Sequence, residues 1–196
     1  MIGFDALQVP SLAQYALLRS LGFEVAMGYT RVWTQDAVGA AKSVDLAVLP
    51  IIEKGQPTSL EYFRDLDTAR RQGAEFRDWA DRVGMPRLFP FMETVDFDCP
   101  VDAVELVILP YVNTLIDAVG GRNALWLYGP HDVIATAALE WPGVAGLMQA
   151  YAPAWSQGRN ATPLAYADSW QVKNGLEVYG VQIDLQRFAT AAALWR

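Results

Sequence analysis

The stretch Leu88-Phe-Pro-Phe-Met-Glu-Thr-Val-Asp-Phe-Asp98 begins like a buried β-strand and ends in carboxylates. Its aromatic and β-branched residues favour a strand, and prolines before and after it mark its ends. Side chains two apart on a strand share a face, so Asp96 and Asp98 are expected to point the same way. Carboxylates are costly to bury without partners, so we expect this strand to open into water or a polar cleft.

These acids have two interpretations. Paired carboxylates in a cleft are what glycosidic-bond cleavage requires, because one donates a proton and the other stabilises or attacks the sugar cation. Alternatively, they cap the helix that is predicted to start near Pro100. The Asp-x-Asp spacing is not specific by itself, because it recurs at Asp65 and Asp67, where an exposed helix face explains it.

Outward from this stretch, the chain repeats a strand followed by a helix five times. The expected strands cover residues 2–5, 23–29, 45–53, 88–98 and 124–128, and the expected helices cover 11–20, 34–42, 59–83, 100–119 and a short segment from 131. Gly73 is a possible break in the helix over 59–83. Three further strands, over 144–151, 164–171 and 177–184, have no helix-length pattern between them, and a last helix is predicted over 185–195.

Eight such strands indicate an α/β protein with a closed TIM-like (β/α) barrel and a helix-poor C-terminal third. An ordinary eightfold barrel needs about 250 residues, so missing helices would account for a chain of 196. An open doubly wound sheet is the alternative, but the first strand is followed by Asp5-Ala-Leu-Gln-Val-Pro10 instead of a Gly-rich phosphate loop. The length and the 53% hydrophobic content predict a single domain over residues 1–196.

The amino-acid composition argues against several classes of function. The formal net charge is −7, and no basic cluster exceeds the pair Arg70-Arg71, so we expect no nucleic-acid partner. The single cysteine, Cys99, excludes internal disulfides, and the single histidine, His131, excludes a His- or Cys-rich zinc site; an all-oxygen Mg²⁺ or Ca²⁺ site stays open. A Ser-His-Asp site would need His131, but no Gly-x-Ser-x-Gly elbow exists.

No apolar run reaches the length of a membrane span, and the N-terminus lacks the pattern of a signal peptide. We therefore expect no membrane span and synthesis in the cytoplasm without a signal peptide.

Active-site groups of a barrel sit at the carboxyl ends of its strands, and acids stand at several predicted strand ends. Carboxylates brought together there repel one another, which raises at least one pKa and keeps a proton available for acid catalysis. The candidate acids are Asp5, Glu53, Asp96, Asp98 and Asp184. Candidate substrate-binding residues at the same rim are Tyr29, Tyr128, Tyr151, Trp155, Trp170 and Gln171, although each Trp or Tyr is also a plausible core residue.

Three segments together resemble the glycoside hydrolase family 25 lysozymes, and still more the glycoside-hydrolase-like domains of unknown function related to them. They are Gly3-Phe4-Asp5, Val95-Asp96-Phe97-Asp98, and the terminal run from Trp170-Gln171 to Gly180-Val-Gln-Ile-Asp184 and Phe188. The segment from Gly73 to Pro86 is similar to the helix that precedes the catalytic strand in that family.

The resemblance implies a flattened barrel of eight strands and about five helices. It also implies cleavage of the β-1,4 bond between N-acetylmuramic acid and N-acetylglucosamine in peptidoglycan, without a metal or organic cofactor. Asp5, Asp96 and Asp184 match acids of the family, while Asp98 stands where the lysozymes have the catalytic Glu. Either Asp98 or Glu93 is therefore expected to be the general acid, with Asp96 stabilising the sugar cation. Glu93 has the wrong strand parity for this role and needs a bulge or an early strand end.

The sequence thus predicts a cell-wall glycan hydrolase. The alternative is a non-catalytic glycan-binding or structural module of a phage-tail or wall-directed assembly. Either protein is expected to act at the cell wall, after release from the cell or as part of a virion.

Overall fold

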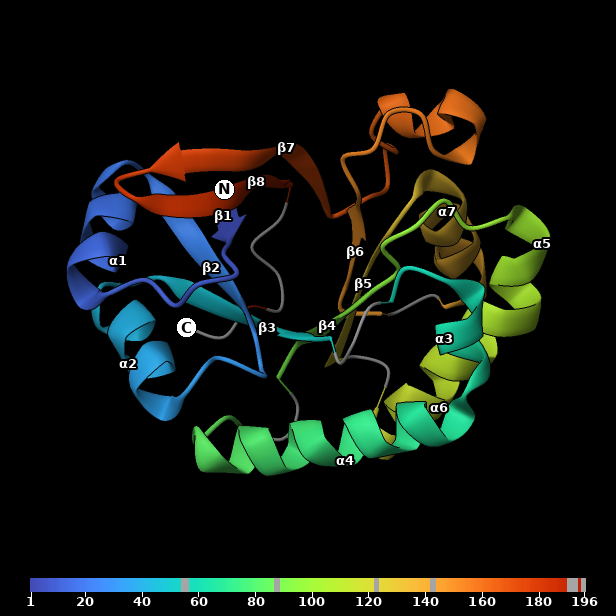
Figure 1. Cartoon of the computed structure of the whole chain (residues 1–196), viewed down its shortest axis with the longest axis horizontal. Coiled ribbons are helices and arrows are strands. Elements are labelled where there is room, and N and C mark those ends of the chain that lie inside the picture. Colours follow the sequence, from blue (N-terminus) through green and yellow to red (C-terminus); the bar gives the residue numbers. More distant parts are fainter. Residues whose placement is uncertain (54–56, 87–88, 122–123, 142–143, 190–193, 195–196) are drawn as a thin grey trace.

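The computed structural model describes residues 1–53, 57–86, 89–121, 124–141, 144–189 and 194, and these form an α/β barrel. Eight strands close into one barrel in the order β1-β2-β3-β4-β5-β6-β7-β8 (Figure 1). The strands are β1 (Ile2–Asp5), β2 (Phe23–Tyr29), β3 (Ala47–Ile52), β4 (Phe91–Thr94), β5 (Leu125–Gly129), β6 (Gly146–Gln149), β7 (Ser169–Val178) and β8 (Val181–Phe188). The predicted closed barrel is confirmed.

Helices cover the barrel on the outside, except where the β7–β8 hairpin lies (Figure 1). They are α1 (Leu12–Ser20), α2 (Gln35–Ser43), α3 (Leu60–Arg64), α4 (Leu66–Arg82), α5 (Val101–Ala103), α6 (Leu109–Val119) and α7 (His131–Glu140). A π-helical turn over Val104–Ile108 joins α5 to α6. Between β6 and β7 the described residues form only a 3₁₀ segment, Ser156–Ala161, so the predicted helix-poor last third is confirmed.

Local capping explains where several helices begin. Ser11 and Gln14 form a reciprocal capping box at the start of α1, and the Thr34 side chain accepts the N–H of Ala37 at the start of α2. The Asp65 carboxylate accepts the N–H groups of Asp67 and Thr68, so α4 begins there as a helix separate from α3. The predicted helix over 59–83 is therefore divided at Asp65, and it is continuous at Gly73.

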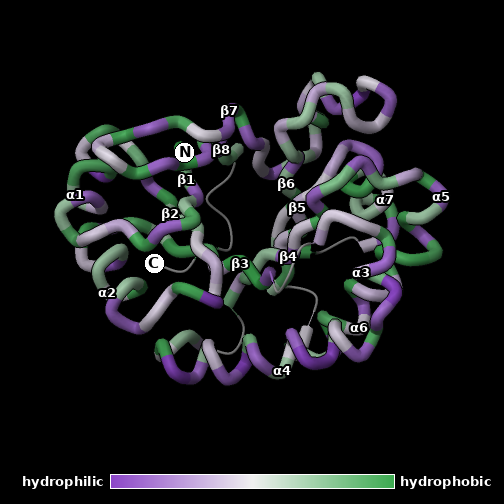
Figure 2. The backbone as a smooth tube through the Cα atoms, viewed as in Figure 1, coloured by the Kyte–Doolittle hydropathy of each residue, from purple (hydrophilic) through white to green (hydrophobic). Residues whose placement is uncertain are grey.

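Two apolar layers hold the fold together. The first fills the barrel itself, and the second lies between the strands and the helices. Figure 2 shows hydrophobic residues in the central strands and both hydrophobic and hydrophilic residues along α4. The interior layer consists of Val25, Met27, Ala47, Leu49, Ile51, Met92, Trp126, Met148, Phe188 and Leu194. This layer fills the barrel interior below its mouth.

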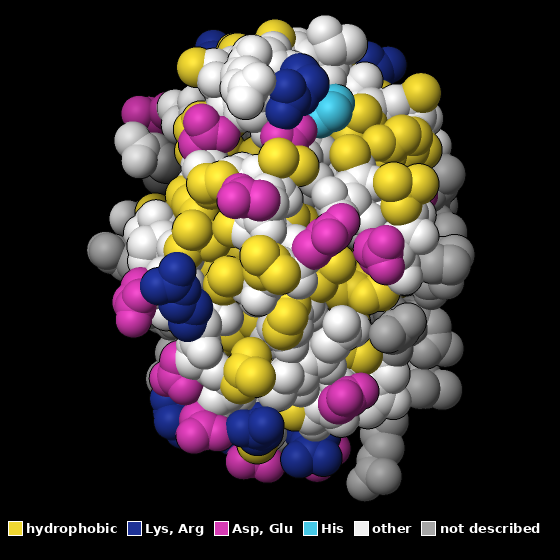
Figure 3. Space-filling view, turned by 90° about the vertical axis from the view of Figure 1, so that its right-hand side faces the viewer, with side chains coloured by type: hydrophobic (Ala, Val, Ile, Leu, Met, Phe, Trp, Pro, Cys, Tyr) yellow, Lys and Arg dark blue, Asp and Glu magenta, His cyan; other side chains and the backbone are white. Residues whose placement is uncertain are grey.

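The outer face of the α5–α7 side also carries apolar side chains. Figure 3 shows hydrophobic side chains gathered over this face. Val101, Leu106 and Leu139 are exposed in these elements. Among the residues that the structure describes, no helix is both long enough and apolar enough to cross a bilayer.

The last two strands differ from their predicted boundaries. Strands β1 to β7 pair with one another in parallel, while β8 runs antiparallel to both β7 and β1. The turn of this hairpin is Tyr179-Gly180, where both residues have positive φ, and not Asn174-Gly175. Gly175, with φ of 63°, instead lies within β7, where the register of the β7–β8 ladder shifts. The helix predicted over 185–195 is wrong as far as Phe188, which ends β8; residues 190–193 and 195–196 lie outside the described residues.

Strand β4 is also shorter than predicted. It covers Phe91–Thr94, so Asp96 and Asp98 follow the strand instead of ending it. Leu88, the predicted start, lies outside the described residues. The alternation of faces that was expected to orient Asp96 and Asp98 alike therefore does not apply to them.

Candidate active site

A cavity of about 120 Å³ opens at the mouth of the barrel, where the parallel strands end. Its floor is the top of the interior layer: Met27, Ile51 and Met92. Its walls are polar and come from both halves of the chain: Asp5, Tyr29, Glu53, Thr94, Asp96, Tyr128, Gln171, Asn174 and Asp184. Four of these are carboxylic acids, and the sequence predicted all four. We call this space the acid cavity.

Strand pairing explains how acids from opposite ends of the chain meet. Asp5 on β1 lies directly opposite Asp184 on β8. Since β8 is antiparallel, Asp184 reaches the mouth from the middle of its strand and not from a carboxyl end. Gln186, two residues further along the same face of β8, donates a hydrogen bond from Nε2 to Oδ2 of Asp5.

Asp184 is held as a hydrogen-bond acceptor. Nε2 of Gln171 donates to its Oδ2 at 3.0 Å, and the backbone N–H of Gly175 donates to its Oδ1 at 2.7 Å. Gln171 is fixed in turn, because its Oε1 accepts the Tyr128 hydroxyl at 2.8 Å and the Tyr151 N–H at 2.9 Å. These donors fix the orientation of the Asp184 carboxylate.

The surroundings of Asp5 and Asp96 favour their protonated forms. Burial raises the pKa of Asp5 well above its usual range, and the negative charge of Asp184 raises it further. Asp96 lies at the mouth, where burial of part of its carboxyl and then the charge of Asp184 raise its pKa. The cavity therefore contains acids that retain their protons to higher pH, which acid catalysis requires.

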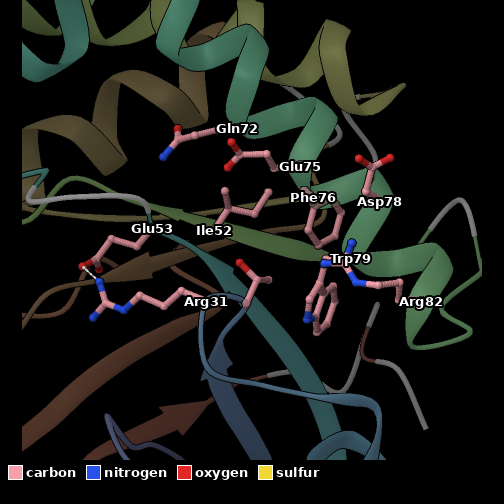
Figure 4. Close-up of a pocket in the computed structure, with 10 residues that line it drawn as sticks. Arg31, Ile52, Glu53, Gln72, Glu75, Phe76, Asp78, Trp79 and Arg82 are labelled. Atoms are coloured by element: carbon pink, nitrogen blue, oxygen red, sulfur yellow. Dashed lines mark ion pairs between the residues drawn. The ribbon is translucent and has the colours of Figure 1, made fainter.

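Glu53 stands at the edge of the acid cavity, just after β3. Its Oε2 accepts the Thr94 hydroxyl at 3.3 Å, and its Oε1 lies 3.6 Å from a guanidinium nitrogen of Arg31 (Figure 4). Arg31 also lies over the Tyr29 ring, 4.9 Å from its centroid. Burial raises the pKa of Glu53, while Arg31 and the Thr94 hydroxyl oppose that change.

The structure does not bring Glu93 or Asp98 to this cavity. Glu93 lies between Met92 and Thr94, which line the cavity, so its side chain leaves β4 on the opposite face and is fully buried. The pairing of β4 contains no bulge that would turn the Glu93 side chain toward the cavity. Asp98 is turned toward the loop after β6, where its Oδ1 accepts the N–H of Ser156 at 2.7 Å.

Two of the remaining predicted residues line a neighbouring pocket of about 150 Å³. Tyr151 and Trp170 lie there, and Gln171 lines both this pocket and the acid cavity. Arg187 lies over the Trp170 ring, 5.8 Å from its centroid. Trp155, half-buried, precedes the 3₁₀ segment and lines neither space. The aromatic pocket, as we name this neighbour, therefore shares Gln171 with the acid cavity.

Sequence reasoning missed four polar residues at the site: Arg31, Thr94, Asn174 and Gln186. Strand parity gave a usable signal for Gln186, because it follows Asp184 by two on β8. Asn174 was hidden in an Asn-Gly pair that resembles a turn. Within the described part of the chain, no group of three His, Cys, Asp or Glu side chains is arranged to hold a metal ion.

Several solved structures share the fold of this chain. No protein-family model and no curated protein matches the chain. Among solved structures, the Mycobacterium tuberculosis Tat-secreted protein Rv2525c, in complex with L-tartrate, matches with a TM-score of 0.84 and 14% identity over 100% of this chain and 98% of that one.

Two further solved structures come from Streptococcus pneumoniae. GHIP, a glycosyl hydrolase 25 described as a virulence factor in host cell invasion, has a TM-score of 0.58 and 10% identity, over 96% of this chain and 86% of GHIP. The modular autolysin LytC has a TM-score of 0.60 and 11% identity, over 94% of this chain and 46% of LytC. At such identities the likeness concerns the fold. The resemblance found in the sequence is confirmed at that level: the chain has the barrel fold of the glycoside hydrolase family 25 lysozymes and their structural relatives.

Proposed function

We propose that this protein hydrolyses a bacterial cell-wall glycan, at the β-1,4 bond of peptidoglycan or a closely related polysaccharide. The observation that carries the proposal is the convergence of Asp5, Glu53, Asp96 and Asp184 on one cavity at the mouth of the barrel. Paired carboxylates, one protonated and one charged, are sufficient for glycoside hydrolysis. The shared fold supports the choice of substrate, because a structure of LytC holds a synthetic peptidoglycan ligand.

In this proposal Glu53 is the general acid. Burial raises its pKa, and its half-buried position at the rim leaves it within reach of a leaving oxygen. Asp96, exposed on the neighbouring strand end, stabilises the positive charge that develops on the sugar. Asp184, fixed by Gln171 and Gly175, orients the substrate. Asp5 lies deeper and bound to Gln186, where its proton limits the repulsion among the four acids.

The aromatic pocket extends the site along the glycan. Tyr151 is 45% exposed, so its ring is available to stack on a sugar. Trp170 lines the same pocket. A glycan that enters here reaches the acids past Gln171. The protein would meet its polymer at the cell wall, either after release from the producing cell or as part of a virion or other wall-directed assembly.

Incubation with purified peptidoglycan sacculi tests the proposal, with released fragments identified by mass spectrometry. We expect new N-acetylmuramic acid reducing ends. Asp96→Asn and Glu53→Gln should each lower the rate by about 100-fold or more, the usual contribution of a positioned acid or base. Asp98→Asn is the matched control, because Asp98 lies outside the cavity, and it should retain most of the activity. Loss of activity in Asp98→Asn but not in Glu53→Gln would indicate that Asp98 is the general acid.

A non-catalytic glycan-binding or structural module is the second candidate. The observation that favours it is the position of Asp98, which replaces the catalytic Glu of the lysozymes it resembles and binds the Ser156 N–H instead of facing the cavity. Binding to sacculi without release of fragments, by the wild-type protein at any pH between 4 and 8, would support this module over the hydrolase.

A further inference from the structure

The segment between β6 and β7 forms one wall of the aromatic pocket. Tyr151, Asn160, Ala161 and Pro163 of this segment line the pocket, opposite residues of β7. We call residues 150–163 the strap; its 3₁₀ segment is the orange coil above α7 in Figure 1. Because the strap contains no other regular structure, its position depends on contacts with neighbouring elements.

The middle of the strap has a backbone conformation that its residues do not favour. Ser156, Gln157 and Gly158 have φ of 53°, 56° and 83°. Only glycine adopts this left-handed region without cost. The Ser156 hydroxyl is buried, and it accepts the backbone N–H of Asp132 at 3.2 Å. Contacts with α7, and not local preference, therefore hold this turn.

An ion pair between Arg159 and Asp132 is the strongest of these contacts. Nε of Arg159 donates to Oδ1 of Asp132 at 3.1 Å, and a terminal guanidinium nitrogen donates to Oδ2 at 2.5 Å. Asp132 lies in the first turn of α7 and is buried, and Nδ1 of His131 lies 3.0 Å from its Oδ1. Such two-point contacts fix a guanidinium in one orientation. The ion pair therefore joins the strap to a rigid helix.

The residue after Arg159 transmits this constraint to the aromatic pocket. Asn160 lines the pocket and is buried. Its Oδ1 accepts the His131 N–H at 2.8 Å, and its Nδ2 donates to the Ala150 carbonyl at 2.8 Å. Asn160 thus connects the start of α7 to the beginning of the strap, and the position of the pocket wall depends on the Arg159 ion pair next to it.

The same ion pair lies apart from the acids. Neither Arg159 nor Asp132 lines the acid cavity or the aromatic pocket. The first residues of the strap have their own support beside the acids, because the Tyr151 N–H donates to Oε1 of Gln171 at 2.9 Å. Loss of the ion pair should therefore change the aromatic pocket and leave the acid cavity in place.

We propose that Arg159 and Asp132 are positioning residues that give the protein a preference for long glycan chains over single disaccharide units. The acid cavity holds the sugar at the reacting bond, and the aromatic pocket, kept in shape by the ion pair, holds a sugar further along the chain. This inference rests on the proposed function and makes it more specific: it concerns the length of glycan that binds, and not the bond that is cleaved.

Calorimetric titration with two glycan fragments tests this. One fragment is the disaccharide of N-acetylglucosamine and N-acetylmuramic acid, and the other is the tetrasaccharide that contains this unit twice. Binding is measured in the Glu53→Gln background, which lacks the proposed general acid, and mass spectrometry afterwards checks that the tetrasaccharide is intact. We expect the tetrasaccharide to bind at least about tenfold more tightly, a ratio that one aromatic contact with a sugar supplies.

Variants of the ion pair separate positioning from general stability. Arg159→Gln should reduce the ratio to about threefold or less and leave binding of the disaccharide unchanged. Arg159→Lys keeps the charge but not the two-point contact, so it should give an intermediate ratio. Arg19→Gln is the matched control, because Arg19 forms a 3.0 Å ion pair with Asp45 and lines neither cavity; it should keep the full ratio.

Near-ultraviolet circular dichroism checks that each variant is folded. Asp132→Asn, which keeps the shape of the side chain and removes its charge, provides the same test if Arg159→Gln does not fold. A ratio near one before any change to the ion pair, no binding of either fragment, or a full ratio in Arg159→Gln would each overturn the inference. Equal loss of the ratio in Arg19→Gln would also overturn it, since the effect would then reflect stability alone.

The outcomes are independent of the hydrolase proposal. A length preference that Arg159→Gln removes supports the positioning role even if sacculi are not cleaved, because a recognition module would show it as well. Cleavage of sacculi without any length preference leaves the hydrolase in place and contradicts the role of Arg159 and Asp132.

Discussion

At the scale of single residues, the most unusual group is the carboxyl of Glu93. It is fully buried on the outer face of β4, and neither of its oxygens has a hydrogen-bond partner in the described part of the chain. Burial raises its pKa well above the usual range, and the charge of Glu53 adds to this effect. The folded protein therefore holds a proton on Glu93 at pH values where the unfolded chain has released it.

This difference predicts how stability depends on pH. An acid whose pKa is higher in the folded state contributes its full stability below its unfolded pKa of about 4.3, and this contribution is lost as pH rises toward the folded pKa. The slope is at most about 1.4 kcal/mol per pH unit for one group. Glu93→Gln, which keeps the shape and removes the titration, should therefore be more stable than wild type near pH 7 and similar to it near pH 4.

Urea denaturation at pH 4, 5, 6 and 7 measures this effect. Because Glu93 is outside the acid cavity, the variant should also retain wild-type activity or glycan binding. A constant difference between the two proteins across this pH range would show that Glu93 does not carry its proton as argued.

Most of the candidate site could be predicted residue by residue, because strand ends and strand parity place side chains. Asp5, Glu53, Asp96 and Asp184 were predicted from strand ends, and the outward direction of Glu93 followed from parity. Asp98 could not be placed, because its orientation depends on a hydrogen bond to Ser156, 58 residues later in the chain. Short-range patterns contain no information about such a contact.

At the scale of elements, Gly73 shows why a glycine in a helix has two interpretations. Glycine weakens helices, so it indicated a break, yet α4 continues through it. A Cβ at Gly73 would collide with the Cβ of Ala118 on α6, so this position needs glycine because the two helices approach closely there. The actual division, at Asp65, depends on a side-chain cap.

Two glycine substitutions with opposite signs test this explanation. Gly73→Ala should destabilise the protein by about 1–2 kcal/mol, because the α4–α6 pair must separate to fit the methyl group. Gly39→Ala, in α2, should stabilise it by about 0.5–1 kcal/mol, because nothing lies within 4 Å of the new Cβ and alanine favours the helix. Equilibrium unfolding of both variants gives the answer, and stabilisation by Gly73→Ala would contradict the close approach.

The β7–β8 hairpin is the element that the sequence pattern described least well. Asn174-Gly175 has the composition of a two-residue turn, but it forms an irregularity inside β7 that places Asn174 at the acid cavity and the Gly175 N–H on Asp184. The turn lies five residues later, at Tyr179-Gly180. Local composition identified a departure from regular strand here, while the pairing of β8 with β1 decides which glycine makes the turn.

At the scale of the whole molecule, the barrel closes through the two ends of the chain. Strand β1 pairs with β8, and the Met1 and Phe188 backbones exchange hydrogen bonds of 3.0 Å in both directions. The number of strands and the helix-poor last third were predictable from the alternation of apolar runs with helical patterns. The antiparallel direction of β8 was not, because it results from a hairpin whose turn, Tyr179-Gly180, lies inside the strand predicted over 177–184.

Leu194 extends this closure and provides the last prediction. It is 8% exposed and belongs to the layer inside the barrel, with Val25 and Phe188. Leu194→Ala should therefore cost about 2–3 kcal/mol of unfolding free energy, in the range of core leucine truncations. Leu139→Ala, at an exposed position of α7, removes the same atoms from a side chain that is 82% exposed and should change stability by less than about 0.5 kcal/mol. The two variants are compared with wild type by urea denaturation followed by tryptophan fluorescence, since Trp126 lies in the same interior layer. Equal effects of the two substitutions would mean that Leu194 does not pack inside the barrel in solution.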